Sequence, residues 1–236
     1  MNDTSLIGKN SQRLLTIIIG VLCAVFALWY LFGFILFEEY ANNAALSNNS
    51  IAIFFKAKKT FSFLLLLLNL LLLIWYIITM NSWKKNVWIT AVIGLSIAII
   101  LGFINRYIVQ HLPNASYDTV RFIDACLDFS SFFGNISTVL LGISFVLFSH
   151  QFDNKLKKMA RFIGLLYFAS VMIVVFDLIF RFALPKNHLI NSYEKILHYL
   201  NLTNRIVFAV RLGLMAFFFL GLSRLKQKKT TAEDAD

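Results

Sequence analysis

Residues 61–80, FSFLLLLLNLLLLIWYIITM, decide the fold. From Leu64 to Ile74 the only polar residue is Asn69, and the stretch shows no amphipathic period, so lipid or apolar helices can surround it. A helix of about 20 apolar residues is long enough to cross a hydrocarbon core about 30 Å thick. The segment therefore predicts a transmembrane helix.

The same pattern recurs on both sides of this segment. We predict six spans, at residues 14–37, 61–80, 87–108, 119–149, 162–184 and 205–224. Only helices and closed barrels satisfy their backbone polar groups in lipid, and no alternating ten-residue pattern indicates a barrel. The expected fold is all-α: one polytopic transmembrane helix bundle, formed as a single domain over residues 1–236.

The composition excludes several classes of protein. The chain has 236 residues, of which 59% are hydrophobic and 14% are charged. In a typical soluble domain about half of the residues are hydrophobic and about a quarter are charged. A soluble enzyme and a disordered chain are therefore excluded. The first apolar run is longer than a signal-peptide core and has no small-residue cleavage motif, so we expect it to be retained as a span.

The basic residues predict the orientation. Twelve Lys and Arg flank the spans on the side of the two termini, and five lie in the loops of the other side. The positive-inside rule then places both termini in the cytoplasm, although Lys56, Lys58 and Lys59 dissent. We therefore attribute the net charge of +10 to basic residues that set the topology and contact anionic membrane lipid. No nucleic-acid partner is expected.

Three local patterns complete the expected architecture. Apolar residues at helical spacing within 187–201 predict an amphipathic helix on the outer surface. Small residues at Ala91, Gly94, Ala98 and Gly102 form a stripe that allows close helix contact. Four tryptophans near span ends are expected in interfacial belts, namely Trp29, Trp75, Trp83 and Trp88.

Polar residues follow one face of the fourth predicted span. They recur at steps of three and four residues, which places them on one side of a helix: Arg121, Asp124, Asp128, Ser131, Asn135, Thr138 and Gly142. Charged groups within spans are costly and usually face the bundle or a water-filled cavity. We therefore expect this helix to be central.

Charges in the other spans fall at the same level of the predicted topology. Asp177 and Arg181 are four apart in the fifth span, and Tyr167 and Ser170 share their face. All the charges fall in the outer half of the membrane, above weakly polar inner ends. The predicted ligand-binding or polar network consists of Arg106, Arg121, Asp124, Asp128, Asn135, Asp177, Arg181 and Arg211.

Two interpretations of this network compete. The carboxylates and guanidiniums can neutralise one another and fix the helix register. Alternatively, the excess of arginine leaves a net positive, outward-facing pocket for an anionic headgroup or small solute, since the guanidinium fork suits carboxylate and phosphate. Coupling to protons or ions through the aspartates is a third, weaker option.

Other site chemistries lack their motifs. The histidines and cysteines have no metal-ligand spacing, so neither a metal nor a cofactor is expected. No catalytic residue is assigned, because the chain has no phosphate loop and no nucleophile elbow. Enzymatic activity is therefore disfavoured without being excluded.

One resemblance adds to this interpretation. The residues that carry it are Phe132, Phe133, Gly134, Leu141, Gly142, Ser149, Tyr167, Asp177, Leu184 and Pro185. They resemble an uncharacterised family of small bacterial six-span integral membrane proteins of unknown function. The resemblance implies the fold and a bacterial cytoplasmic (inner) membrane, and it implies no activity.

Three functions follow, in order of preference. The first is a protein that binds or transports a small anionic solute or lipid headgroup in an outward-facing Asp/Arg-lined pocket. The second is a structural or accessory subunit, with a membrane-protein partner or a homo-oligomer covering its polar stripe. The third is an intramembrane enzyme on outer-leaflet lipid, with Asp124 or Asp128 as base.

Overall fold

The described residues form six long helices. The structure, a computed structural model, describes residues 3–43, 48–79, 84–111, 117–152, 154–183 and 190–233. Every regular element in these ranges is helical, and they contain no strand. The elements are α1 (Asp3–Asn43), α2 (Asn48–Ile78), α3 (Lys85–His111), α4 (Tyr117–Ser149), α5 (Asn154–Ala183) and α6 (Ile190–Glu233).

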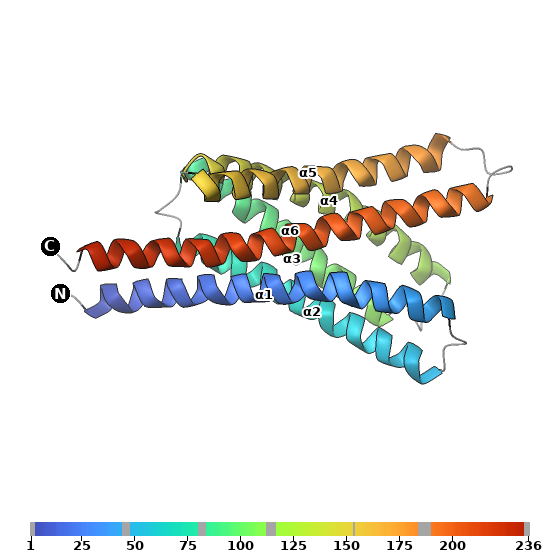
Figure 1. The fold of residues 1–236 in the computed structure, drawn as a ribbon. Helices are drawn as coiled ribbons and strands as arrows, with labels where there is room; N and C mark the ends of the chain where they lie inside the picture. Colours follow the sequence, from blue (N-terminus) through green and yellow to red (C-terminus); the bar gives the residue numbers. More distant parts are fainter. Residues whose placement is uncertain are drawn as a thin grey trace.

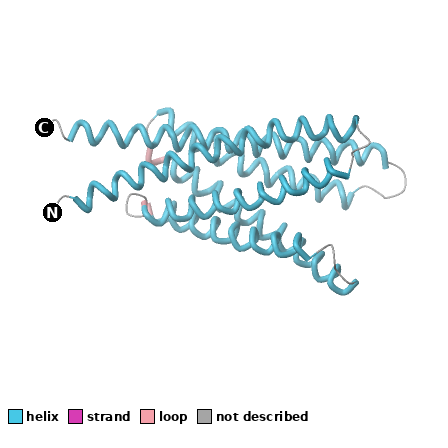
Figure 2. The backbone as a smooth tube through the Cα atoms, turned by 90° about the horizontal axis from the view of Figure 1, so that it is seen from below, coloured by secondary structure: helices cyan, strands magenta, loops and turns pink. Residues whose placement is uncertain are grey.

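The helices close into a ring. Each packs against its neighbours in the chain, and α6 packs most extensively against α1. Successive helices run in opposite directions, so the start of α1 and the finish of α6 lie at the same end of the bundle (Figures 1 and 2). We call this the terminal end.

Within the described ranges, five helices contain a stretch long and apolar enough to cross a membrane: Asn10–Phe32, Lys85–Ile104, Phe129–Ser149, Lys155–Ile179 and His198–Arg224. In α2 the apolar stretch within the described residues is shorter, Phe63–Ile78. The predicted all-helical membrane bundle is thus confirmed in its helices, their order and five candidate spans.

The last helix differs from its expected form. Residues from Ile190 onward are helical, but they continue without a break into α6. The amphipathic segment that was expected as a separate surface helix therefore forms the first turns of α6. Only one helix is present because no proline or glycine interrupts residues 190–212.

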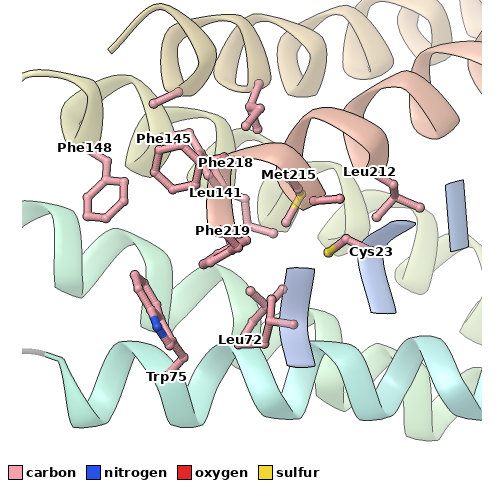
Figure 3. Close-up of a cluster of buried hydrophobic side chains, with 14 of the residues drawn as sticks. Cys23, Leu72, Trp75, Leu141, Phe145, Phe148, Leu212, Met215, Phe218 and Phe219 are labelled. Carbon is pink, nitrogen blue, oxygen red and sulfur yellow. The ribbon is translucent and has the colours of Figure 1, made fainter. Parts of the chain in front are cut away.

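Aromatic side chains fill the ring near the terminal end. Trp75 of α2 meets Phe219 of α6 edge-on, with ring centroids 5.2 Å apart. Phe148 of α4 lies 6.2 Å from Trp75 and 5.6 Å from Phe218. Figure 3 shows these rings converging from α2, α4 and α6. Since lipid offers no hydrophobic drive between helices, such close packing is a main source of their association.

Trp75 corrects one expectation. Its position near a span end suggested an interfacial belt, but the side chain is fully buried. Its indole Nε1 donates a hydrogen bond to Thr16 Oγ1 of α1 at 2.9 Å. Trp29, by contrast, is exposed on the outside of the bundle. Sequence position alone could not tell an inward-facing tryptophan from an outward-facing one.

Small residues set two helix contacts. Ser137 of α4 donates its hydroxyl to the Gly94 carbonyl of α3 at 2.7 Å, which confirms close contact at that point of the predicted small-residue stripe. Between α4 and α5, a Cβ built on Gly164 would lie 2.9 Å from the Gly142 carbonyl oxygen and 2.6 Å from Val146 Cγ2. The two glycines therefore allow backbone-to-backbone approach of these helices.

Candidate functional site: a buried guanidinium

Arg211 is the one charged residue that is buried among the side chains the structure describes. The residue is 7% exposed and lies at the centre of the apolar stretch His198–Arg224 of α6. At about 1.5 Å per residue, its Cα is about 20 Å along the helix from either end of that stretch. It therefore lies far from both ends of this apolar stretch.

Ser170 of α5 supplies a weak polar contact. Arg211 Nη1 donates to Ser170 Oγ at 3.5 Å, the outer limit for such a bond. The Ser170 hydroxyl in turn donates to the Leu166 carbonyl at 3.1 Å, which fixes its lone pairs toward the guanidinium. Arg211 Nε is buried and has no hydrogen-bond partner among the described residues.

Aromatic rings surround the same guanidinium. Arg211 Cζ lies over the Tyr167 ring at 4.0 Å and over the Phe208 ring at 4.7 Å. Tyr30 of α1 extends this wall, because its ring centroid is 4.6 Å from that of Phe208. The three rings come from α5, α6 and α1, so the site exists only where these helices meet.

Packing holds Tyr167 in place. Its ring stacks on Phe145 of α4 at 5.9 Å, with an interplanar angle of 20°. Its hydroxyl donates to Met215 Sδ at 3.7 Å. Phe145 and Met215 therefore hold the Tyr167 side chain, and core packing fixes the ring face that contacts Arg211.

The free energy of these contacts can be compared with the cost of burying the charge. Removing an ion from water costs several kcal/mol even after relaxation. A desolvated cation–π contact returns about 2 kcal/mol, and a neutral hydrogen bond of ordinary length about 1 kcal/mol. No carboxylate among the described residues is paired with Arg211. The described contacts therefore offset only part of the cost, and an anion beside the guanidinium would stabilise it.

Two further charged residues lie on α5 and on α6, the helix of Arg211. Asp177 is half-buried on α5, on the same face as Ser170 and two turns further along. Arg205 is exposed on α6. Each takes part in an interaction with another residue.

The structure describes the side chains of four of the eight residues in the predicted network: Arg106, Asn135, Asp177 and Arg211. Arg106 is exposed on α3, and its guanidinium lies over the Phe63 ring of α2 at 4.9 Å. It is thus satisfied on the α2–α3 side of the ring. Asn135 is half-buried on α4. Among the described side chains of the predicted network, Arg211 is the one that is buried.

The polar face of α4 is only partly inside. Gly142 is buried against α5, and Asn135 and Thr138 are half-buried. Ser131, in contrast, is exposed, and Thr138 donates its hydroxyl to the Gly134 carbonyl of its own helix at 2.8 Å. In the described part, α4 packs on α3 and α5, and its Phe145 and Phe148 also reach Phe218 of α6.

Four predicted residues have side chains outside the described residues. Arg121, Asp124 and Asp128 fall within α4, and Arg181 falls within α5. Their places in helices agree with the predicted helical spacing. Their roles in the network stay predictions.

Sequence reasoning missed two members of the site, Phe208 and Tyr30. Phe208 could have been found, because it is three residues before Arg211 and so shares its helix face. Tyr30 could not, because it reaches the site only through the packing of α1 on α6.

Comparisons with known proteins add no relative. No model of a protein family, no curated protein and no solved structure matches this chain.

Proposed function

We propose that the chain is a six-span integral membrane protein that binds or transports a small anionic solute or lipid headgroup at a site centred on Arg211. The supporting observation is the buried guanidinium, which is held by rings and one long hydrogen bond and whose buried Nε has no partner among the described residues. Asp177, Arg181 and the charges at the start of α4 would tune the net charge at the outer entrance.

The proposed topology has six crossings and cytoplasmic termini. α1 begins and α6 ends at the same end of the bundle (Figure 1). If α2 also crosses the membrane, six crossings place both ends of the chain on one side, which agrees with this arrangement. The basic residues near that end support a cytoplasmic location. We place the protein in a bacterial inner membrane on the resemblance of its fourth and fifth helices.

The test uses the protein purified in a neutral maltoside detergent. Native mass spectrometry of wild type is expected to reveal a bound anion, and Arg211→Met is expected to lose it. Methionine has a similar length and no charge, so the variant removes the cation with little change of shape. Arg224→Met is the matched control, because Arg224 is an exposed arginine of the same helix.

Each outcome decides the proposal. Retention of the anion by the control and its loss from Arg211→Met would support a site at Arg211. If wild type carries no anion, and Arg211→Met is as stable as wild type, the guanidinium has no binding role. The result would then favour a structural or accessory subunit, whose polar groups serve helix packing.

A further inference from the structure

The hydrogen-bonding edges of Arg211 restrict the ligand. A guanidinium presents its N–H donors in one plane. The rings of Tyr167 and Phe208 pack against Arg211, so a ligand cannot approach from the sides that these rings occupy. Nη1 already faces Ser170. The edge formed by Nε and Nη2 is the one that carries a buried donor without a described partner.

This edge has the shape of a carboxylate. Two parallel N–H groups match the two oxygens of a planar carboxylate in a bidentate pair. A phosphate also accepts from such an edge, but its remaining oxygens then need further donors. Around Arg211, the described neighbours offer rings, a thioether and the hydroxyls of Ser170 and Tyr167, which already donate to Leu166 and Met215. Tyr30, which packs on Phe208, adds one further hydroxyl.

The local charge favours a single negative charge. Arg211 is the only arginine or lysine that is buried among the side chains the structure describes. A monoanion neutralises it, whereas a dianion leaves one uncompensated charge in apolar surroundings, at a cost of several kcal/mol.

The depth of the site favours an apolar remainder. Leu212 and Met215 lie on the adjoining turn of α6 and are nearly fully buried in the apolar core (Figure 3). A ligand that reaches the middle of the span must therefore cross apolar surroundings. An acyl chain does so at low cost, since lipid and protein interior are both apolar.

Resting on the proposed function, we infer that the ligand of Arg211 is an amphiphilic monocarboxylate, bound side-on through the Nε–Nη2 edge of the guanidinium. Ser170 holds the opposite edge, and the rings of Tyr167 and Phe208 cover the cation. The residue that selects carboxylate is Arg211, with Ser170 as a positioning residue.

The experiment compares three probes with the same ten-carbon chain. Decanoate, decyl phosphate and decanol are titrated into the purified full-length protein in neutral detergent, and thermal unfolding is recorded. At a tenfold excess over its Kd, decanoate should raise Tm by about 3–6 °C. Decyl phosphate should bind at least tenfold more weakly, and decanol should give no shift.

Variants assign the effect to the guanidinium edge. Arg211→Lys keeps a cation but presents a point charge, so decanoate affinity should fall at least tenfold and its preference over decyl phosphate should vanish. Ser170→Ala should weaken decanoate about threefold to tenfold while the preference persists. Arg224→Met should match wild type. Should Arg211→Lys not fold, competition between decanoate and decyl phosphate on wild type, read by native mass spectrometry, decides the preference.

The results separate this inference from the proposed function. If decyl phosphate stabilises at least as well as decanoate, and Arg211→Lys or Arg211→Met abolishes the effect, an anion site exists and the carboxylate assignment is overturned. If decanol matches decanoate, the chain alone binds and the assignment is likewise overturned. If no anion stabilises wild type, the proposed function fails as well.

Discussion

The indole nitrogen of Trp75 and the hydroxyl of Thr16 are joined by a hydrogen bond of 2.9 Å across 59 positions of sequence. Thr16 in turn donates to the Gln12 carbonyl at 2.7 Å, so its hydroxyl links the two helices. Both side chains are fully buried. This contact ties α1 to α2, which otherwise pack less extensively than the other neighbours.

Loss of the acceptor should destabilise the bundle. Thr16→Val keeps the shape of the side chain and leaves the indole N–H buried without its partner, at a cost of about 1–3 kcal/mol. Unfolding in detergent, followed by near-ultraviolet circular dichroism, measures the change. Trp75→Phe combined with Thr16→Val should cost less than the sum of the two single variants, because the contact is shared. Strictly additive effects would argue against the bond.

The α4–α5 crossing should reject a methyl group. In Gly164→Ala the added Cβ meets Val146 Cγ2 at 2.6 Å and the Gly142 carbonyl at 2.9 Å, so the helices must separate. Overpacking of this kind costs about 1–3 kcal/mol. Unfolding midpoints of the purified variants provide the test.

Gly134→Ala is the matched control for that crossing. Its added Cβ would have its nearest contact at 3.8 Å, with Leu101. Alanine also favours a helix over glycine by about 1 kcal/mol, so this variant should be neutral or more stable. Equal behaviour of the two variants would contradict the close approach of α4 and α5.

The α3–α4 contact should depend on one hydroxyl. Ser137→Ala removes the donor to the Gly94 carbonyl, and bonds of this kind between membrane helices contribute about 0.6–1.7 kcal/mol. Ser131→Ala on the same helix should change the unfolding free energy little, because Ser131 is exposed. The difference between the two unfolding free energies measures the bond. A Ser131 variant that loses as much stability as the Ser137 variant would refute this assignment.

The proposed topology can be read by chemical labelling. In a background with Cys23 and Cys126 replaced by alanine, single cysteines are introduced as Lys84→Cys and Asn201→Cys, both at exposed positions. A membrane-impermeant maleimide added to right-side-out vesicles should label position 201 at once and position 84 only after permeabilisation. Labelling of both or neither before permeabilisation would contradict a six-span bundle with cytoplasmic termini.

Hydropathy predicted the helices well because lipid imposes a one-dimensional constraint. The apolar run around Leu64–Ile74 lies inside α2, and the polar series from Arg121 to Gly142 lies within one unbroken helix. Helix ends were harder, because α6 extends past its apolar stretch on both sides. Length beyond the hydrocarbon core is set by local propensity rather than by lipid.

The site was predicted only in part, for a related reason. Spacing on one helix placed Tyr167 and Ser170 on a common face, and both reach Arg211. It gave no means to learn that Arg106 pairs with Phe63 on another side of the ring, or that Tyr30 joins the Arg211 site. Such relations depend on which helices are neighbours, and no single-helix pattern carries that information.

The packing of α6 on α1 has a consequence for how the protein is made. Synthesis proceeds from α1, so five helices leave the ribosome before the helix that closes the ring exists. Until then, the groups of α1 that face α6, Gly20 and Tyr30 among them, lack their final neighbours. The arginine of the buried site lies on α6 and so follows these five helices. Closure of the ring and completion of the Arg211 site therefore both wait for α6.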